Sequence, residues 1–503
     1  MLRLKFSRWY LLVAAFLVEF CLGSIYAWSV LNQPIDLAFY GDAQKGRAVN
    51  AFYISMGVLG TATAALGPLV ERKGPRWSVS IGSTLFLVGH LVTALGVYFA
   101  SIALVYIGYG VITGLGIGLC TISPVSALQK WFPDYRGTAA GFATAGAGAG
   151  SVMWSKVFLP TIDSVGLGWM FVLIGSIISA TMFATLVVLR DPPRDYTVNG
   201  RDIHGNRIEE REALEDQGDD IYTMYHTPKS GDQSEAAEFG YTPIESMTLK
   251  EAILSTDYIF MYFTFFANQL FGIIVVSRLS NMCTDIFKKS ASTASDMVSI
   301  NSAFNCCGRL AFSVISDLLV LIFSVEKTYA RKMVYFFTLG AQIILIGMLP
   351  TVIRQESFTS FVIEIFVLTS CFGGGLGTIP ALIADMYGPY NVGPLHGIII
   401  TSVSFAAVVG GITFNKAYNG KIADGMSVDE AYIDNFQVIL VIVCIGFVML
   451  FFVRTDVKDR FEPGYHYSLC GKRIISIAPR EYKASGHTGT VQSDSTCEIS
   501  ENI

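Results

Sequence analysis

The chain has 503 residues, of which 52% are hydrophobic and only 15% are charged. Soluble domains usually carry about 25% charged residues, so this composition excludes an ordinary soluble protein and indicates a polytopic membrane protein. The net charge of −5 gives no reason to expect a nucleic-acid partner, and the nine cysteines lack the CxxC spacing of a zinc site or a disulfide framework.

Twelve apolar segments follow one another along the chain. The first is preceded by Arg3, Lys5 and Arg8 and is too long for the core of a signal peptide. Each segment can cross a hydrocarbon layer of ~30 Å as a helix. We therefore predict an all-α membrane protein with twelve transmembrane helices in two six-helix bundles. The segments lie near 9–31, 50–70, 77–99, 101–127, 138–160, 168–190, 254–282, 294–323, 330–351, 357–384, 393–415 and 435–454.

A polar stretch divides these segments six and six. We expect an N-terminal bundle at 1–190, a central loop at 191–252, a C-terminal bundle at 253–455 and a tail at 456–503. Lys and Arg gather in the loops on one side of a twelve-span count, the side that also carries both termini. The positive-inside rule then predicts that both termini and the central loop are cytosolic. We favour the plasma membrane over an organelle membrane.

The central loop and the tail are polar. The loop contains EEREALEDQGDD at 209–220 and lacks enough apolar residues to form a core, so we expect it to be mostly disordered. It is either a solvated tether or a regulatory segment with unknown partner proteins. The tail after Arg454 has a similar composition.

An internal repeat supports the division into two halves. The stretches 124–141 and 380–397 have equal length and match at paired prolines and glycines between the fourth and fifth segments of each half. Such duplication predicts a site between the halves, near the middle of the membrane. Glycine-rich runs at 108–118, 141–150 and 373–377 favour close helix packing over phosphate binding, because no Lys-Ser/Thr follows them.

The eighth segment carries a polar stripe. Asn301, Asn305, Arg309 and Ser313 recur at every fourth residue and share one helix face. A charge near mid-membrane costs roughly 2.5–3.5 kcal/mol, so Arg309 should face the bundle interior or a water-filled cavity. Its planar fork of donors suits a carboxylate. Two interpretations follow: an anion site inside a transporter, or a structural arginine paired with a carbonyl or a carboxylate.

The first segment contributes other candidates. Glu19 lies in its middle, where a buried carboxyl can carry a proton, pair statically with Arg309, or remain a protonated structural group. Tyr26 and Trp28 are expected either to wall the site or to serve only as packing. Arg278, near the outer end of the seventh segment, could guard the external mouth.

Two motifs resemble the major facilitator superfamily. GPLVERKGPRW at 67–77 is similar to that superfamily's loop between helices 2 and 3, and GRLAFSVISD at 308–317 is similar to its counterpart in the second half. The resemblance implies a twelve-helix transporter in which Glu71, Arg72 and Asp317 brace the cytosolic gate.

Three further stretches, 8–31, 247–276 and 383–402, resemble the oxalate/formate antiporter family, which is related to the monocarboxylate transporters. The resemblance implies small carboxylate substrates, with Arg309 matching the arginine that binds the substrate carboxylate. The chain also departs from these families. The region 397–411 has no Lys or Arg where the oxalate carrier has a second basic residue, and Asn305 stands where monocarboxylate transporters have an acid.

We therefore predict a secondary transporter of a small organic anion, most simply a monocarboxylate such as lactate, pyruvate or formate, by symport or antiport. Arg309 would hold the carboxylate, Asn305 and Asn301 would extend the polar face, and Tyr26 and Trp28 would line the opposite wall. If Glu19 pairs with Arg309 in the empty carrier, substrate or a proton would exchange with that pair. The alternatives are an oxalate/formate-type exchanger, a carrier of an unrelated metabolite or drug in which Arg309 is structural, and a non-transporting membrane sensor. The spans contain no nucleophile–base pair or metal cluster, so we expect neither an enzyme nor a cofactor.

Overall fold

The computed structural model describes residues 6–43, 45–133, 135–193, 196–202, 248–323, 325–387, 392–456, 459–460, 465–469 and 472–477. The chain forms two compact units, Met1–Thr455 and Asp456–Ile503. The predicted disorder of the central loop concerns residues that lie mostly outside this description.

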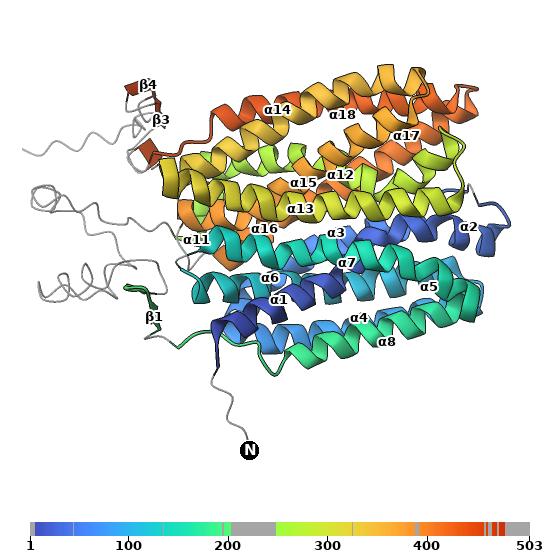
Figure 1. The fold of residues 1–503 in the computed structure, drawn as a ribbon, viewed down its shortest axis with the longest axis horizontal. Helices are drawn as coiled ribbons and strands as arrows, with labels where there is room; N and C mark the ends of the chain where they lie inside the picture. The colour runs from blue at the N-terminus through green and yellow to red at the C-terminus, as the bar shows by residue number, and fades with distance from the viewer. Residues whose placement is uncertain are drawn as a thin grey trace, which may run out of the picture. The chain divides into compact units, whose positions relative to one another are not determined.

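The first unit consists of long helices that lie side by side, with the two halves of the chain in separate groups (Figure 1). The first half holds α1 (Arg8–Leu22), η1 (Gly23–Leu31), α2 (Asn32–Tyr40), α3 (Val49–Lys73), α4 (Pro75–Tyr98), α5 (Ile102–Val105), η2 (Tyr106–Thr113), α6 (Gly114–Trp131), α7 (Arg136–Val165) and α8 (Leu167–Thr185). The second half holds α11 (Leu249–Leu254), α12 (Thr256–Asp285), α13 (Ala291–Phe323), α14 (Lys327–Arg354), α15 (Phe358–Tyr387), α16 (Val392–Phe405), η4 (Ala406–Gly411), α17 (Ile412–Ala423) and α18 (Val428–Phe451). We call the face at which α1 begins the amino face, and the other end of the helices the opposite face.

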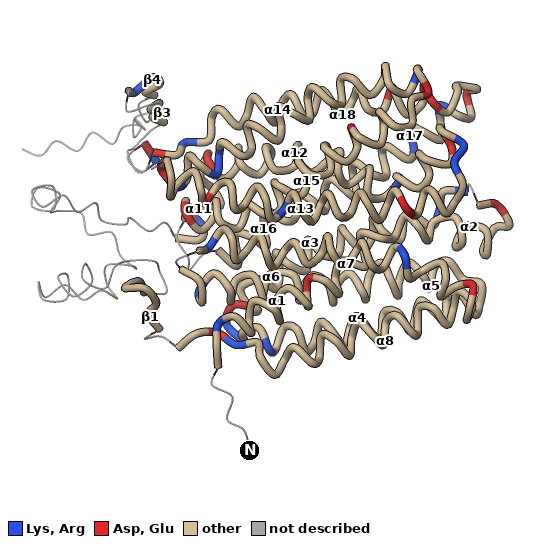
Figure 2. Tube along the Cα trace, in the orientation of Figure 1, with Lys and Arg blue, Asp and Glu red and all other residues tan. Residues whose placement is uncertain are grey.

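Eleven helical segments in the described part are long and apolar enough to cross a membrane. The helix α7 joins them as a twelfth segment of similar length, although its many glycines and alanines and its charged residues lower its hydropathy. Charged residues gather at the two ends of the helices and are sparse between them (Figure 2). This is the distribution expected of helices that cross a bilayer.

Glycines bring the helices of the two halves together. A side chain at Gly148 of α7 would collide with Cys306 of α13, and one at Gly60 of α3 would collide with Ser404 of α16. The pairs α7–α13 and α3–α16 are accordingly among the most extensive helix contacts in the described chain. Small residues allow membrane helices to approach this closely. The glycine-rich run 141–150 therefore has a packing role.

The internal repeat is visible in the helix boundaries. The helix α6 ends at Trp131 and α7 begins at Arg136, while α15 ends at Tyr387 and α16 begins at Val392. These boundaries fall at equivalent positions of the two repeated stretches. The repeat therefore places a helix end and the following helix start at matching positions in each half.

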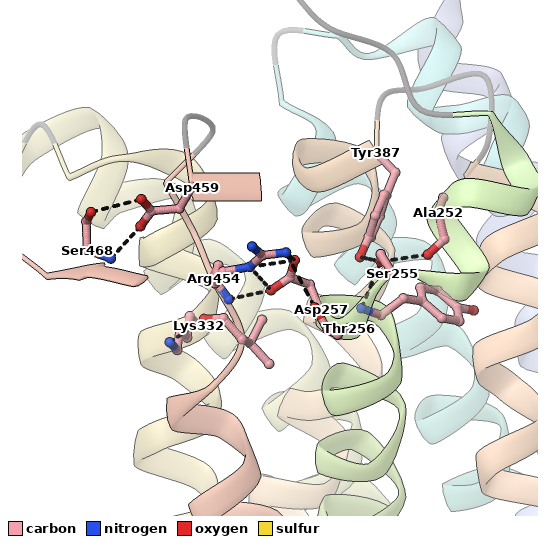
Figure 3. Close-up of polar contacts among 11 residues, drawn as sticks. Ala252, Ser255, Thr256, Asp257, Lys332, Tyr387, Arg454, Asp459 and Ser468 are labelled. Atoms are coloured by element: carbon pink, nitrogen blue, oxygen red, sulfur yellow. Dashed lines mark hydrogen bonds and ion pairs between the residues drawn. The ribbon is translucent and has the colours of Figure 1, made fainter. Parts of the chain in front are cut away.

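A buried ion pair joins α12 to the end of α18 (Figure 3). The Arg454 guanidinium donates to both carboxylate oxygens of Asp257, at 2.7 to 3.1 Å, and the Arg454 backbone N–H also donates to Oδ1, at 2.8 Å. The Lys332 ammonium of α14 donates to the Val453 carbonyl oxygen at 2.6 Å. These contacts fix three helix ends of the second half at the amino face.

The described residues include four short strands. The strands β1 (Thr197–Val198) and β2 (Arg201–Asp202) form an antiparallel pair. In the second unit, β3 (Tyr465–Leu469) and β4 (Lys472–Ile477) also pair antiparallel, and the Asp459 carboxylate accepts hydrogen bonds from the backbone and hydroxyl of Ser468. The sequence analysis noted only that the composition of the tail resembles that of the central loop. The described part of the tail includes this hairpin, whose tyrosines and isoleucines favour strands.

Candidate functional site

A cavity of about 50 Å³ lies inside the first unit, between its two halves. It has room for roughly three to five water molecules. Most of the lining residues are apolar, and a few of them carry ionisable side chains. The lining consists of Glu19, Leu22, Ile25, Tyr26, Met56, Leu59, Ile117, Thr121, Val125, Thr144 and Ala147 from the first half, and Arg309, Leu376, His396, Ile400 and Val403 from the second.

Arg309 is the fixed cation of this cavity. Its side chain is buried, with 3% of the residue surface exposed. Nε donates to Asn305 Oδ1 at 2.8 Å, and Nη1 donates to the Thr144 carbonyl oxygen at 3.0 Å. The ring centre of Tyr26 lies 5.3 Å from the guanidinium carbon, within the range of a cation–π interaction. Nη2 has no hydrogen-bond partner. The guanidinium is thus held on three sides and keeps one donor group free.

Glu19 brings a carboxyl group to the same cavity from α1. It is 4% exposed, and its Oε1 has no hydrogen-bond partner. Glu19 makes no ion pair with Arg309 in the described structure, although both residues line the cavity. A buried charge without a partner is costly. Because Glu19 and Arg309 line the same cavity, an ionised Glu19 can compensate the charge of Arg309 without touching it.

His396 of α16 is a third ionisable group of the cavity, and the sequence analysis missed it. The residue is 4% exposed and lines the cavity beside apolar Ile400 and Val403. A signal was present in the sequence: His396 is an ionisable residue in an apolar segment, directly before the interval 397–411 that lacks Lys and Arg.

The polar stripe of α13 is buried along its whole length. Asn305 orients Arg309 through its side-chain oxygen, while its Nδ2 has no partner. Asn301 lies two turns before Arg309, is buried with an unpartnered Oδ1, and does not line the cavity. The four-residue spacing drifts around the helix by about 40° per step, which accounts for this separation.

Tyr26 and Trp28 have different positions. Tyr26 lines the cavity. Trp28 lies outside the cavity lining, where its Nε1 donates to the Ala48 carbonyl oxygen at 3.2 Å and its ring packs 4.1 Å from that of Tyr109. Trp28 is nine residues after Glu19, which in a regular helix is about half a turn away from the Glu19 face. The sequence spacing thus contained a signal that separates the two aromatic residues.

One polar network at the amino face surrounds Glu71. Its carboxylate forms an ion pair with Lys130 and accepts a hydrogen bond from Ser126 Oγ at 2.9 Å. Lys130 also pairs with Asp191 at 3.4 Å. Burial raises the pKa of the Asp191 carboxyl, and Lys130 only partly offsets that effect. Gly393 of the second half lies so close that an added Cβ would be 2.6 Å from the Glu71 carboxylate.

A second network at the amino face surrounds Asp317 of α13. The backbone N–H and the hydroxyl of Thr138 donate to Asp317 Oδ2 at 2.8 and 2.7 Å. Arg331 pairs with Asp317 at 2.5 Å and with Asp385 at 3.3 Å. Gly137 lets the Asp317 carboxylate approach α7, as Gly393 does for Glu71. Each network thus contacts both halves.

Arg72 lies next to Glu71 in sequence but is exposed at the end of α3. It does not take part in either network within the described residues. Nor do those residues include a group of three His, Cys, Asp or Glu side chains that could hold a metal ion.

Two packed groups of membrane-length helices with a charged cavity between them are typical of secondary transporters. The sequence profile of the Major Facilitator Superfamily matches residues 8–411. The chain therefore belongs to the Major Facilitator Superfamily, and it is an integral, multi-pass membrane protein and a secondary transporter.

Several known proteins are similar to this chain. The uncharacterized MFS-type transporter YhjX of Escherichia coli K12 is 22% identical over 405 residues, which cover 80% of this chain and 86% of YhjX. The oxalate:formate antiporter of Oxalobacter formigenes is 29% identical over 191 residues, or 37% of this chain and 43% of the antiporter. The structure of the proton:xylose symporter XylE bound to 6-bromo-6-deoxy-D-glucose aligns with a TM-score of 0.63 at 15% identity, covering 89% of this chain and 96% of XylE. At this sequence identity, the similarity to XylE shows the fold alone.

Proposed function

We propose that the protein is a secondary active transporter of small organic anions, most simply monocarboxylates such as formate, lactate or pyruvate. The observation that carries this proposal is Arg309, a fully buried guanidinium with a free Nη2 beside a cavity between the two halves. Asn305 and the Thr144 carbonyl hold the other donors in place, so the fork is oriented before a ligand arrives. Preorganised donors of this kind suit a carboxylate.

The size and charge of the cavity favour a small monoanion. A volume of about 50 Å³ suits formate better than a larger organic acid in this conformation. Arg309 is the fixed cation among the lining residues, and it can compensate one negative charge. A second buried carboxylate would lack a permanent partner, which is costly.

Glu19 offers a route to proton coupling. In the empty carrier an ionised Glu19 would compensate Arg309 across the cavity. When a carboxylate binds Arg309, a proton on Glu19 would keep the cavity neutral. Both loaded and empty carriers could then close around the site without burying a net charge. Substrate and proton would therefore move together in one direction.

Alternating access would involve the Glu71 and Asp317 networks as the gate at the amino face. For the cavity to open there, Asp317 must separate from Thr138 of α7, and Glu71 must separate from Gly393. We also propose that the amino face is cytosolic and that the protein lies in the plasma membrane, since basic residues are concentrated in loops on this side. The lipid bilayer is then its constant partner.

Anion exchange is the second candidate function. The partial similarity of this chain to the oxalate:formate antiporter of Oxalobacter formigenes favours exchange. In an exchanger, one anion would leave Arg309 only as another replaces it, and Glu19 would not need to release a proton.

The test is uptake of radiolabelled formate, lactate, pyruvate, oxalate and xylose into vesicles that hold the purified protein. Uptake of a monocarboxylate that other carboxylates inhibit would support the proposal. Stimulation by unlabelled anion inside the vesicles, without any effect of a proton gradient, would favour exchange. Uptake of xylose unaffected by carboxylates would contradict an anion carrier.

A further inference from the structure

A second buried arginine lies far along α12 from the amino face. Arg278 is 4% exposed and stands seven residues before the end of its helix, about 10 Å from the opposite face. It does not line the central cavity. Its Nη2 donates to Asn415 Oδ1, and its Nε has no partner. The guanidinium carbon lies 5.3 Å from the ring centre of Tyr418.

The charge of Arg278 has no direct carboxylate partner in the described structure. Arg278 interacts with the hydroxyls of Tyr53 and Tyr432. Asp285 lies within range of its charge, but the two groups form no ion pair in the described structure, and Asp285 Oδ1 accepts from the Thr284 hydroxyl at 2.9 Å. Asp36 accepts from the backbone N–H groups of residues 46–48 instead. A buried cation among neutral oxygens and aromatic rings is incompletely compensated.

Arg278 lies beside a seam between the halves at the opposite face. Tyr53 of α3 hydrogen-bonds Ser277, the residue before Arg278, at 3.1 Å. Asn415, the partner of Arg278, donates to the Gly46 carbonyl oxygen of the first half at 3.4 Å. Asn32 of α2 donates to the Ser277 carbonyl oxygen at 3.0 Å. Tyr53 also interacts with Arg278 itself, whereas Asn32 and Gly46 contact its neighbours Ser277 and Asn415. These three seam residues, Asn32, Gly46 and Tyr53, therefore join the first half to the surroundings of Arg278.

Opening of this seam would change the surroundings of Arg278 on one side only. The contacts from Tyr53 and Gly46 would be lost, because they come from the other half. Asn415 and Tyr418 of α17 would stay, because they belong to the same half. The guanidinium would then be exposed to the opened cleft while still held in position.

We propose that Arg278 forms a second anion site at the opposite face, which takes a small monovalent anion, a carboxylate such as formate or a halide such as chloride, when the seam is open. The anion would bind the guanidinium fork through Nε and a terminal nitrogen. The site is separate from Arg309 and would receive anions before they reach the central cavity.

The test uses purified full-length carrier with the Arg309→Ala substitution, which removes the central cation. Its Tm is measured in increasing sodium formate, with sodium isethionate, a bulkier sulfonate without a carboxylate, added to keep ionic strength constant, and then in sodium chloride. An anion that binds the folded protein raises the Tm. We expect a rise in formate that disappears when Arg278→Gln is added. The matched control is Lys156→Gln, which removes an exposed cation paired with Asp296 and should preserve the rise.

The possible outcomes distinguish which anions bind and whether Arg278 binds them. A larger shift with formate than with chloride assigns the site to carboxylates, and equal shifts assign it to small anions in general. An equal formate response with and without Arg278→Gln would overturn the proposal. Should that double variant fail to fold, Arg278→Lys keeps the charge but removes the fork; a reduced response is expected, and an unchanged response would overturn the site. Because Arg309 is absent throughout, the result does not depend on the transport proposal.

Discussion

At the scale of single residues, the cavity is defined by charges that are near each other but not paired. Arg309 and Glu19 line the same space, yet each keeps a buried polar atom without a partner. A static ion pair would have satisfied these atoms and filled the space between them. The arrangement is better suited to binding a third charged group or a proton.

Glu19→Gln should uncouple transport from protons. Glutamine resembles the protonated carboxyl in shape but cannot release a proton, so the proposed coupling step is lost. We expect formate uptake driven by an inward proton gradient to fall by about tenfold or more, corresponding to at least ~1.4 kcal/mol, while formate–formate exchange continues. Vesicle uptake with and without the gradient measures both. Gradient-driven uptake equal to that of the unsubstituted carrier would rule out Glu19 as the coupling group.

His396→Lys should shift selectivity toward dianions. Lysine places a second fixed cation in the cavity lining and can compensate a second carboxylate. We expect the ratio of oxalate to formate uptake to rise by about tenfold. His396→Gln is the control, because it adds no charge and should leave the ratio unchanged. If the two variants behave alike, His396 does not contact the second charge.

The sequence was sufficient for some of these residues and not for others. The four-residue stripe and the mid-helix position pointed to Arg309 and Glu19, which both line the cavity, and to Asn305, which contacts Arg309. Their roles stay predictions. Helix spacing can identify His396 as a polar residue of an apolar segment, but it cannot show that α16 and α13 place His396 and Arg309 in the lining of one cavity. Trp28 was grouped with Tyr26 because both are aromatic, whereas their angular positions on the helix differ.

At the scale of elements, α13 is the helix that positions the site. Gly308 of α13 lies against the Ser370 carbonyl of α15, and Gly377 of α15 lies against the Arg309 carbonyl. On the other side Gly141 of α7 approaches the same carbonyl. The backbone at Arg309 is thereby fixed between two neighbouring helices.

Gly377→Val should destabilise the protein. The new side chain would overlap the Arg309 carbonyl, and overpacking of this kind costs about 1–3 kcal/mol or more. We expect a lower Tm of the purified carrier and a lower yield of folded protein. Gly340→Ala is the matched control, since the nearest atom to its Cβ is a ring carbon of Phe447 at 3.9 Å. A Tm for Gly377→Val as high as that of the control would contradict the tight contact.

Most elements follow from the sequence because hydropathy alone locates long apolar helices. The glycine- and alanine-rich α7 was still predicted as a span, since a bilayer-length segment needs few charges rather than high hydropathy. The segments that interrupt the regular α-helices were not predicted. These are the 3₁₀ segment η1 and the π segments η2 and η4, which depend on packing against neighbouring helices. The β3–β4 hairpin was also missed, because a short alternating stretch is a weak signal beside a polar tail.

At the scale of the whole first unit, polar contacts join the two halves at both faces. The Asp317 network joins α7 to α13 at the amino face, and the contacts of Asn32 and Tyr53 with Ser277 join the halves at the opposite face. The cavity is lined by both halves, and these polar contacts hold the halves together at each face in this conformation. Transport requires the contacts at each face to separate in turn.

Asp317→Asn should loosen the amino face. The substitution removes the charge that pairs with Arg331 and weakens the bonds from Thr138, so the open form becomes more populated. We expect amide hydrogen exchange in residues 136–145 to accelerate by about tenfold, as a ~1.4 kcal/mol loss would produce. Glu430→Gln is the control, because its ion pair with Arg354 is exposed and lies within the second half. Unchanged exchange in 136–145 would show that the network does not hold this face closed.

The most direct test of the account is formate uptake by the Arg309→Ala carrier. Radiolabelled formate is supplied under an inward proton gradient to vesicles that hold either the unsubstituted protein or the variant. The account predicts accumulation by the unsubstituted protein and uptake no greater than that of empty vesicles by Arg309→Ala, with both proteins eluting as folded, monodisperse species. Equal uptake by the two proteins would contradict the assignment of Arg309 as the carboxylate site.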